Sequence, residues 1–456
     1  MSANEIAITN QLLKHTDKVF VVGGAVRDLL MGKKPHDFDL ATDLQPQQIV
    51  DIFGSDFAKL TGNVFPTVRV RHGEAEIEIS TFRRETPSDD PSNQGNRNAT
   101  SFEFSDNVEE DVQRRDLTIN ALALNAKTGD LVDPVGGADD IQTKTIRFVN
   151  NALDRIKEDP SRYLRAVRFK LRIGGRYSES AKLALSSEEA RSEVLNKLSS
   201  DMIRQELLKG VESVEGFSGF FKDLNDFGLL RDLFPEIHEM VDHDGGPWHG
   251  EDVFTHSMDA GDHYGKVDPE DKRDILGKFS AYLHDFGKTA SYDKDQRTFY
   301  DHESIGAERV VDFLKRFRFS NDEIKFVQLM IANHMRKPTS LKGVRKMFTE
   351  VGDNYTYLVK LSKADTMSNR RKTEDEVQKS LEVIDEIESL IERVRSEKST
   401  FEKIDVNGHD LMTEFGLKPG PHLREMLEFA KEVVLEDPSK NKKDVLIESI
   451  RKRFKV

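Results

Sequence analysis

The stretch GGAVRDLLMGKKPHDFDLAT, residues 23–42, joins a Gly-Gly turn to an Arg-Asp pair and two closely spaced aspartates. It follows the apolar run VFVV, so we expect the glycines to end a strand in a turn whose backbone N–H groups can approach a phosphate. Asp37 and Asp39 are two residues apart, so on a strand both would point to the same face. By itself the stretch predicts only phosphate chemistry of some kind, because glycine turns and single aspartate pairs are common.

Acidic and apolar residues alternate in EAEIEISTF, residues 74–82, which predicts a strand that is buried on one side. Ile77 and Ile79 form one face, and Glu78 lies on the other with two further glutamates. A solvated strand face accounts for this pattern. If Glu78 instead lies beside the aspartate pair, the carboxylates repel one another unless a hard dication such as Mg²⁺ lies between them. Such a triad would serve phosphoryl or nucleotidyl transfer.

The composition narrows the class of protein. A chain of 456 residues predicts about two to four domains. A net charge of −14 argues against a protein that coats nucleic acid indiscriminately, although a local basic groove is compatible with it. Since there is no cysteine, any metal must be held by histidine and carboxylate. No apolar run approaches membrane-spanning length and the N-terminus has no signal-like pattern, so we expect a cytoplasmic protein without membrane contact.

Two kinds of periodicity divide the chain. Short β-rich runs and turns fill residues 18–150: VFVVGG, TVRVRH, EIEISTF, INALALN and TIRFV. The polar stretch 85–111 interrupts them and is typical of a long loop. From about residue 151 the pattern is helical, and residues 374–397 predict a packing helix with one apolar face. We therefore expect an α+β fold, in which a mixed β-sheet with helices is followed by an all-α remainder.

Several motifs occur together in a known order. GGAVRDLLMG…HDFDLAT, EISTFR, RRDLTINALAL, DPVGG and EDPSRYLRAVRF follow one another as they do in class II tRNA nucleotidyltransferases, the bacterial-type CCA-adding enzymes and poly(A) polymerases, and residues 20–175 resemble that family. The resemblance implies that Asp37 and Asp39 hold catalytic Mg²⁺ and that Glu78 is the third carboxylate. It also implies a nucleotide site that includes Gly23, Gly24, Arg27, Asp28, Arg115, Asp116 and Asn120. Leu117 stands where the family usually has phenylalanine, a change expected to affect packing only.

The segment EDPSRYLRAVRF would choose the nucleotide. Asp159 precedes Pro160 and could be a plain helix N-cap, but in the resembling family the matching Asp and Arg form a template for the base edge. Here these residues are Asp159 and Arg162, with Arg165 and Arg168 continuing the nucleotide site. The same arginines form a stripe with Arg172, either a solvated face or a contact for RNA phosphates. The loop of residues 84–110 matches a flexible element that the family needs to switch from C to A.

A second constellation lies in the helical half, in HGEDVFTHSM, YLHDFGK, YDHESIG, IANHMRK and KADTMS. Neutral imidazoles and carboxylates from separate helices suit a divalent metal, and the pattern resembles the HD phosphohydrolase superfamily. The resemblance implies one or two ions, with Ni²⁺, Mn²⁺ or Co²⁺ as candidates, on His256, His284, Asp285, His302, His334 and Asp365. His249 is either a residue on the substrate side or an ordinary loop histidine, and we leave it unassigned.

Four domains follow from these motifs: a nucleotidyltransferase head (1–150), a helical neck (151–235), an HD domain (236–370) and a helical tail (371–456). The tail motif DVNGHDLMTEFGLKPGPHL and the basic end suggest tRNA contact, although GLKPGP could simply connect two helices. The expected function is CCA addition to the tRNA 3′ end from CTP and ATP, with an HD phosphatase or 2′,3′-cyclic phosphodiesterase activity and no obligatory protein partner. The alternatives are a poly(A) polymerase, or an HD hydrolase with an RNA-binding head.

Overall fold

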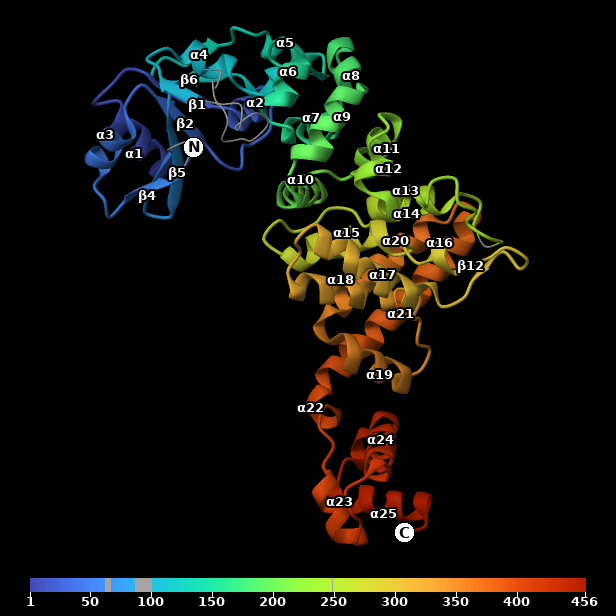
Figure 1. Cartoon of the computed structure of the whole chain (residues 1–456). Helices are drawn as coiled ribbons and strands as arrows, with labels where there is room; N and C mark the ends of the chain where they lie inside the picture. The colour runs from blue at the N-terminus through green and yellow to red at the C-terminus, as the bar shows by residue number, and fades with distance from the viewer. Residues whose placement is uncertain (62–66, 87–100, 248) are drawn as a thin grey trace. The chain divides into compact units, whose positions relative to one another are not determined.

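The computed structural model describes residues 1–61, 67–86, 101–247 and 249–456. The chain forms two compact units, Met1–Pro235 and Glu236–Val456. A sheet with surrounding helices opens the first unit, whereas the second is nearly all helical (Figure 1). The α+β fold expected from the sequence is therefore confirmed. The finer division into head, neck, HD domain and tail stays a prediction.

One mixed sheet of seven strands organises the first unit, in the order β3-β4-β5-β2-β1-β8-β9. Strand β2 runs parallel to β5, with Leu40 opposite Ile79, and every other neighbouring pair is antiparallel. The strands are β1 (Val19–Val22), β2 (Asp39–Thr42), β3 (Ala58–Thr61), β4 (Thr67–His72), β5 (Ala75–Thr81), β8 (Ala123–Asn125) and β9 (Leu131–Val132).

Side-chain alternation explains how the sheet is buried. All of β1 is buried, while β5 alternates, with Ile77 and Ile79 inside and Glu76 and Glu78 outside, as the sequence pattern predicts. One cluster of the buried core includes residues of β1, β2 and β8. It contains Phe20, Val22, Ala41, Phe82, Val112, Ala121, Ala123 and Val149. The end of β1, which leads into Gly23, and the start of β2 at Asp39 are therefore fixed by the buried residues beside them.

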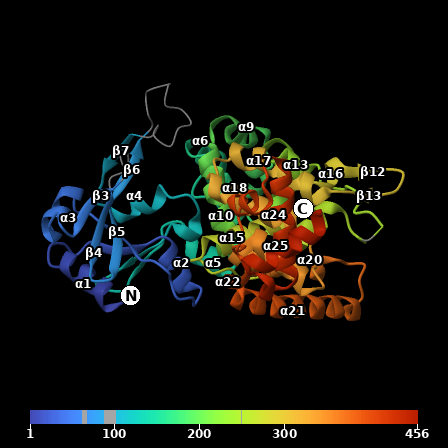
Figure 2. The ribbon, with the colours of Figure 1, turned by 90° about the horizontal axis from the view of Figure 1, so that it is seen from below.

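Short helices surround the sheet, and longer ones follow it. Helices α1 (Ala3–Leu12) and α3 (Pro46–Phe53) pack against β4 and lie beside the β3–β5 strands in Figure 2. Helix α7 (Ser161–Arg172) packs against α10 (Ser200–Ser213) and α11 (Ser218–Asp226). The other helices are α2 (Gly24–Leu30), α4 (Val108–Gln113), α5 (Gly137–Gln142), α6 (Ala152–Glu158), α8 (Glu179–Leu185), α9 (Glu188–Lys197) and α12 (Leu230–Leu233).

Three local expectations differ from the structure. Asp37 precedes β2 and is not on the strand, because the strand begins at Asp39. The run INALALN begins as a 3₁₀ turn, η2 (Thr118–Asn120), and only its end joins the sheet. In TIRFV only β10 (Thr145–Ile146) is a strand, and it pairs with β11 (Arg176–Tyr177) outside the main sheet. These short apolar runs are buried, and burial alone does not distinguish a strand from a packed turn.

The described parts of the polar stretch 85–111 include strands and a helix, which the prediction of a long loop did not include. Strand β6 (Arg83–Thr86) pairs antiparallel with β7 (Ser101–Phe104), and α4 follows after a short turn. Residues 87–100, the middle of the proposed flexible element, lie outside the described residues.

Helices make up nearly all of the second unit. Helices α14, α15, α18 and α20 pack against one another, and α21 lies against α19 and α20 with Ile384, Ile387 and Ile391 buried. No helix in the described part of the chain is long and apolar enough to cross a membrane. The elements are α13 (Pro235–His238), α14 (Val253–His263), α15 (Lys272–Leu283), α16 (Lys288–Ser291), β12 (Tyr292–Asp293), β13 (Thr298–Phe299), α17 (His302–Arg316), α18 (Asn321–Asn333), α19 (Leu341–Val351), α20 (Tyr355–Ser368), α21 (Glu374–Ser396), α22 (Lys398–Phe401), α23 (Gly408–Phe415), α24 (Pro421–Glu436) and α25 (Lys443–Phe454).

Candidate functional site

The first unit contains a strongly basic cavity of about 560 Å³. Asp39, expected to be catalytic, lines it together with most residues of the expected nucleotide site: Gly23, Gly24, Arg27, Arg115, Asp116, Asn120, Asp159, Arg162, Arg165 and Arg168. Arg83, Arg114, Glu158, Phe169, Arg172 and Lys209 complete the lining. Basic side chains outnumber acidic ones in this lining, which favours a polyphosphate ligand.

The glycine turn leaves room for two arginines of the cavity. Gly23 has a φ of +71°, and a Cβ there would lie 3.1 Å from Nη1 of Arg115. A Cβ on Gly24 would lie 3.3 Å from Nη2 of Arg27. A larger residue at Gly23 would therefore strain the backbone and displace a guanidinium group.

Arg27 is buried and fixed by two neighbours. Its Nη1 donates to Oδ1 of Asn120 at 2.6 Å, and its Nε donates to Oδ1 of Asp28 at 2.8 Å. The other oxygen of Asp28 accepts from Nη2 of Arg172 at 3.1 Å. Asp28, expected at the triphosphate end, is not among the cavity-lining residues and acts from behind by orienting two arginines.

The three predicted catalytic carboxylates are close enough to influence one another electrostatically, but they do not form one tight cluster. Asp39 lines the cavity, but Asp37 and Glu78 do not. Asp37 Oδ1 lies 3.0 Å from Nδ1 of His36, and Glu78 accepts from Nη2 of Arg69 at 2.8 Å. Within the described ranges, the groups of three or more potential ligands with atoms inside 4.8 Å of one another do not include this triad.

The electrostatics of Asp39 nevertheless suit a cation. Burial and the nearby charges of Glu78 and Asp37 raise the pKa of Asp39 to about 6, although Arg115 opposes this shift. Carboxylates that repel one another are stabilised by a dication, and an all-oxygen ligand set is what Mg²⁺ prefers. The donor set of Asp37, Asp39 and Glu78 therefore fits Mg²⁺.

Asp111 anchors two arginines and was not singled out from the sequence. It is fully buried on α4, and its oxygens lie 2.7 Å from Nη2 of Arg114 and 3.1 Å from Nη2 of Arg115. Burial by itself would raise the pKa of Asp111, but the charges of Arg114 and Arg115 hold it below its ordinary value. The sequence did contain a signal for this pairing, because Asp111 precedes Arg114 by three residues and Arg115 by four, the spacings at which side chains meet on a helix.

The arginine stripe of α7 is neither a solvated face nor a set of free phosphate ligands, because each member pairs with a carboxylate. The N–O distances are 2.6 Å for Arg162–Glu158, 2.7 Å for Arg165–Asp116, 2.7 Å for Arg168–Glu206 and 3.1 Å for Arg172–Asp28. Two of these pairs, those of Asp116 and Asp28, join α7 to the sheet region. The stripe thus shapes the cavity and positions its charges.

Asp159 is the C-cap residue of α6, directly before Pro160, and it also lines the cavity. Its Oδ1 accepts from the backbone N–H of Ser161 at 3.0 Å and from the Ser161 hydroxyl at 2.6 Å. Arg162, one turn along, lines the same cavity and donates to Glu158. The interpretation of Asp159 as a plain N-cap is wrong, because Pro160 holds the N-cap position of α7 and the Asp159 side chain accepts from Ser161 at the start of that helix.

The second unit brings all six predicted metal ligands to one buried cluster. Asp285 lies at its centre, with Oδ2 at 3.4 Å from Nε2 of His284 and 3.7 Å from Nε2 of His256. Its Oδ1 lies 3.5 Å from Nε2 of His302 and 3.9 Å from Nε2 of His334. Asp365 Oδ1 completes the cluster at 3.0 Å from Nε2 of His256.

These separations suit two ions that share Asp285. Atoms bound to one ion at about 2.1 Å lie roughly 3 to 4 Å apart. Of the three potential ligand groups in the described residues, two share Asp285: one contains His256, His284 and Asp285, and the other contains Asp285, His302 and His334. The third contains His249, Glu251 and His256. The mixed imidazole and carboxylate donor set fits a divalent transition metal.

Backbone contacts orient three of the histidines toward this cluster. Nδ1 of His284, His302 and His334 lies 2.9, 2.9 and 2.7 Å from the carbonyl oxygens of Ala281, Phe299 and Ile331. Each Nε2 is then left to face Asp285, as in metal sites whose ligands are held by outer contacts. Burial lowers the pKa of His334 to about 3, so its imidazole is neutral and able to bind a metal.

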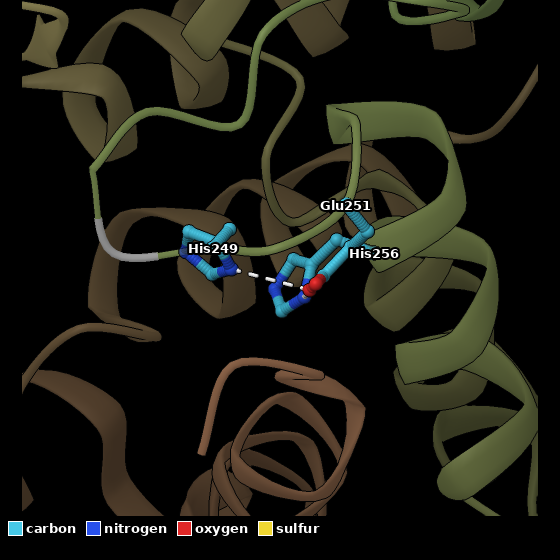
Figure 3. Close-up of side chains that lie close together, drawn as sticks. All are labelled: His249, Glu251 and His256. Carbon is cyan, nitrogen blue, oxygen red and sulfur yellow. Dashed lines mark hydrogen bonds and ion pairs between the residues drawn. The ribbon is translucent and has the colours of Figure 1, made fainter.

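His249 and Glu251 lie beside His256, as Figure 3 shows. Glu251 Oε1 is 3.0 Å from Nδ1 of His256 and 3.4 Å from Nδ1 of His249. Nε2 of His249 lies 3.3 Å from Nζ of Lys288, which in turn is 2.7 Å from Oδ2 of Asp285. His249 also lines a cavity of about 510 Å³ together with Asp285, His302, His334 and Asp365, so it neighbours the histidine–aspartate cluster.

Family models match both ends of the chain. Residues 19–147 match the poly(A) polymerase head domain, and residues 298–450 match tRNA nucleotidyltransferase domain 2. His256, His284 and Asp285 lie outside both matched ranges.

Curated relatives and solved structures resemble the chain over different lengths. Poly(A) polymerase I of Salmonella typhi is 34% identical over 52% of this chain and 51% of its own length, so the chain spans about half of that relative. A CCA-adding enzyme of Lactococcus lactis subsp. lactis is 26% identical over 98% of this chain and 96% of its own. The crystal structure of the Bacillus stearothermophilus CCA-adding enzyme in complex with CTP covers both chains completely, with a TM-score of 0.66 and 20% identity, which shows the same fold.

Replacing Asp111 by Asn should destabilise the first unit in a pH-dependent way. Because the folded-state pKa of Asp111 is lowered, its stabilisation is present above its unfolded pKa, about 3.9, and is lost as the pH falls through the folded value. We expect the variant to lose about 3 kcal/mol of unfolding free energy at pH 7. Urea unfolding of both proteins between pH 7 and pH 2 measures this difference.

The difference between the two proteins should shrink below a pH of about 4. An exposed carboxylate such as Asp51, replaced by Asn, is the control and should change little at any pH. Equal stability of wild type and Asp111→Asn at pH 7 would contradict the role of this residue.

Proposed function

We propose that this chain, whose head belongs to the family of class II tRNA nucleotidyltransferases and poly(A) polymerases, adds C, C and A to the 3′ end of tRNA from CTP and ATP. The observation that carries the proposal is the basic cavity in which the glycine turn, Asp39, Arg115 and the Asp159–Arg162 pair meet. The alignment with a CCA-adding enzyme over nearly the whole chain supports it.

In the proposed reaction the 3′-hydroxyl of the RNA attacks the α-phosphorus of the nucleoside triphosphate. A bond forms between that phosphorus and the 3′ oxygen, the bond to the bridging β-phosphate oxygen breaks, pyrophosphate leaves, and the hydroxyl proton passes to solvent. Mg²⁺ on Asp37 and Asp39 would supply charge neutralisation and hydroxyl activation. Arg27 and Arg115 bind the triphosphate in the cavity, held in place by Asp28 and Asp111.

Base selection belongs to Asp159 and Arg162 in this proposal. A carboxylate acceptor and a guanidinium donor fork match the amino and ring-nitrogen edge of cytosine or adenine, and they mismatch uracil and guanine. Both residues line the cavity, and Glu158 steadies the guanidinium group of Arg162. The tail, residues 371–456, would contact the tRNA backbone and position it without reading its sequence.

The nearest alternative is a poly(A) polymerase, because a relative of that name is 34% identical over about half of this chain. Purified protein incubated with tRNA lacking CCA, with ATP and CTP singly and together, separates the two. Addition that stops after C, C and A supports our proposal, whereas a ladder of A residues supports the alternative. We expect Asp37→Ala and Asp39→Ala each to lower addition about a hundredfold or more.

The matched control for these variants is Asp51→Ala, on the surface of α3 and away from the cavity. It removes a carboxylate without touching the site and should keep wild-type addition. If Asp37→Ala and Asp39→Ala also kept it, the assignment of the metal ligands would be wrong.

Substitution of Asp159 or Arg162 should change which nucleotide is added more than whether one is added. We expect Arg162→Ala to lower the preference for CTP and ATP over UTP and GTP by about tenfold or more, since one lost base contact is worth about 1–3 kcal/mol. Single-turnover incorporation of each of the four nucleotides measures this. An unchanged preference combined with reduced rate would assign Arg162 to phosphate binding instead.

The second unit supports an additional activity, a metal-dependent phosphohydrolase of the HD type that acts as a phosphatase or 2′,3′-cyclic phosphodiesterase. Its support is the convergence of His256, His284, Asp285, His302, His334 and Asp365 beside a cavity. In the hydrolysis, water adds to phosphorus, one P–O ester bond breaks, and the leaving ribose oxygen takes a proton. Such a step would open damaged 3′ ends before nucleotide addition.

Replacing His284 or Asp285 by Ala should abolish hydrolysis of adenosine 2′,3′-cyclic phosphate with Mn²⁺, Ni²⁺ or Co²⁺ and lower metal content while sparing CCA addition. His263→Ala, an exposed histidine on α14, is the control and should keep both. Metal content by mass spectrometry and product analysis measure the outcome. Hydrolysis without any nucleotide addition by the wild type would favour a hydrolase with an RNA-binding head.

A further inference from the structure

The cavity beside the metal cluster contains a buried hydroxyl that the cluster does not use. Thr366 on α20 is only 2% exposed and lines the cavity. Its Oγ1 makes no hydrogen bond within the described part of the chain. A buried hydroxyl without a partner costs about 1–3 kcal/mol, so this group points to a ligand that is polar where it meets Thr366.

Two lysines that form no ion pair within the described part of the chain add positive charge to the same cavity. Lys337, after α18, and Lys372, before α21, both line it. Among the described residues Lys337 forms no ion pair. Nζ of Lys372 donates to the Ser380 hydroxyl at 3.4 Å, and its charge helps the backbone and side chain of Thr373 to lower the pKa of Glu376. Lys288 differs, because Asp285 compensates its charge at 2.7 Å. Asp285 therefore accounts for Lys288, whereas Lys337 and, beside the charge of Glu376, Lys372 remain for another anionic group.

Two large apolar side chains complete the cavity and are unusually exposed. Tyr300 is 67% exposed and Met335 is 53% exposed, and both line the cavity. The Tyr300 hydroxyl donates to Oε1 of Gln296 at 3.3 Å, which ties the ring to the β12–β13 hairpin. An exposed aromatic ring beside a thioether, next to cationic groups, suits the flat face of a nucleobase.

We propose that this cavity binds the last two nucleotides of an RNA strand. Tyr300 and Met335 contact the terminal base, Lys337 and Lys372 bind the phosphate between the two nucleotides, and Thr366 donates to the terminal phosphoester at the metal cluster. The inference rests on the proposed hydrolase function and deepens it, because it makes the end of a strand, and not a mononucleotide, the preferred substrate.

Binding measured by calorimetry tests the lysines without relying on turnover. The probes are the hydrolysis-resistant 3′-phosphorothioates of ApA and of adenosine, with the full chain and Mn²⁺. We expect the dinucleotide to bind about tenfold more tightly than the mononucleotide, as one added charge-assisted contact allows. Lys337→Glu and Lys372→Glu should each remove this preference, because they weaken binding of the dinucleotide more than binding of the mononucleotide.

Lys294→Glu makes the same charge change in the β12–β13 turn, outside the cavity, and should keep the preference. Equal binding of the two probes by the wild type, or an unchanged preference in both lysine variants, would overturn the proposal.

Tyr300 is tested by a pair of substitutions. Tyr300→Ala should weaken binding of both probes about tenfold, since base stacking on an aromatic ring is worth about 1–3 kcal/mol. Tyr300→Phe keeps the ring and should bind as the wild type does. If Tyr300→Ala binds both probes normally, the ring does not contact the base and that part of the proposal fails.

Hydrolysis rates distinguish a failure of the strand-end inference from a failure of the proposed hydrolase function. If the wild type cleaves adenosine 2′,3′-cyclic phosphate and the corresponding ApA ester with equal kcat/KM, the hydrolase stands and the strand-end inference is overturned. If it cleaves neither, the hydrolase proposal fails, and the calorimetric preference alone decides whether the cavity holds a strand end. We expect a kcat/KM about tenfold higher for the ApA ester, lost in Lys337→Glu.

Discussion

Pairing between arginines and buried carboxylates holds the basic cavity of the first unit together. Guanidinium groups gathered around one cavity repel one another, and burial makes their charge more costly. Asp111 offsets this for Arg114 and Arg115, and Asp116 does so for Arg165. Because these carboxylates contact the arginines from behind or from the side, the cavity keeps an excess of positive charge and a fixed geometry for a polyphosphate.

In the second unit a single carboxylate, Asp285, lies close to the Nε2 atoms of four histidines. Asp285 lies between two groups of histidines, and outer contacts direct their Nε2 atoms toward it. An anionic centre is thus available for cations, while Lys288 compensates it in their absence. The two units differ in where the carboxylates lie: Asp28 and Asp111 support arginines around the cavity of the first unit, whereas Asp285 lies at the centre of the histidine cluster of the second.

Much of both sites was predictable because sequence order and residue type carry the chemistry. The motif around Gly23, the RRD segment and the HD pair each placed ligating residues in cavities that the structure also has. Predictions failed where burial decides the backbone. INALALN became a 3₁₀ turn before its strand, and Asp37 lay outside β2, because apolar content alone does not specify a strand.

The sequence by itself determined which groups could do chemistry: carboxylates and histidines in place of cysteine, a glycine turn, and arginines in helical register. Only the tertiary structure decided what each group does to its neighbours. Asp28, expected in the nucleotide site, supports two arginines, and Asp111, which the sequence did not single out, does the same. The arginine stripe forms a set of ion pairs, and the Thr366 hydroxyl has no hydrogen-bond partner within the described residues. The reason is physical, since burial and pairing are set by residues far apart in the chain, and spacing along the sequence does not encode them.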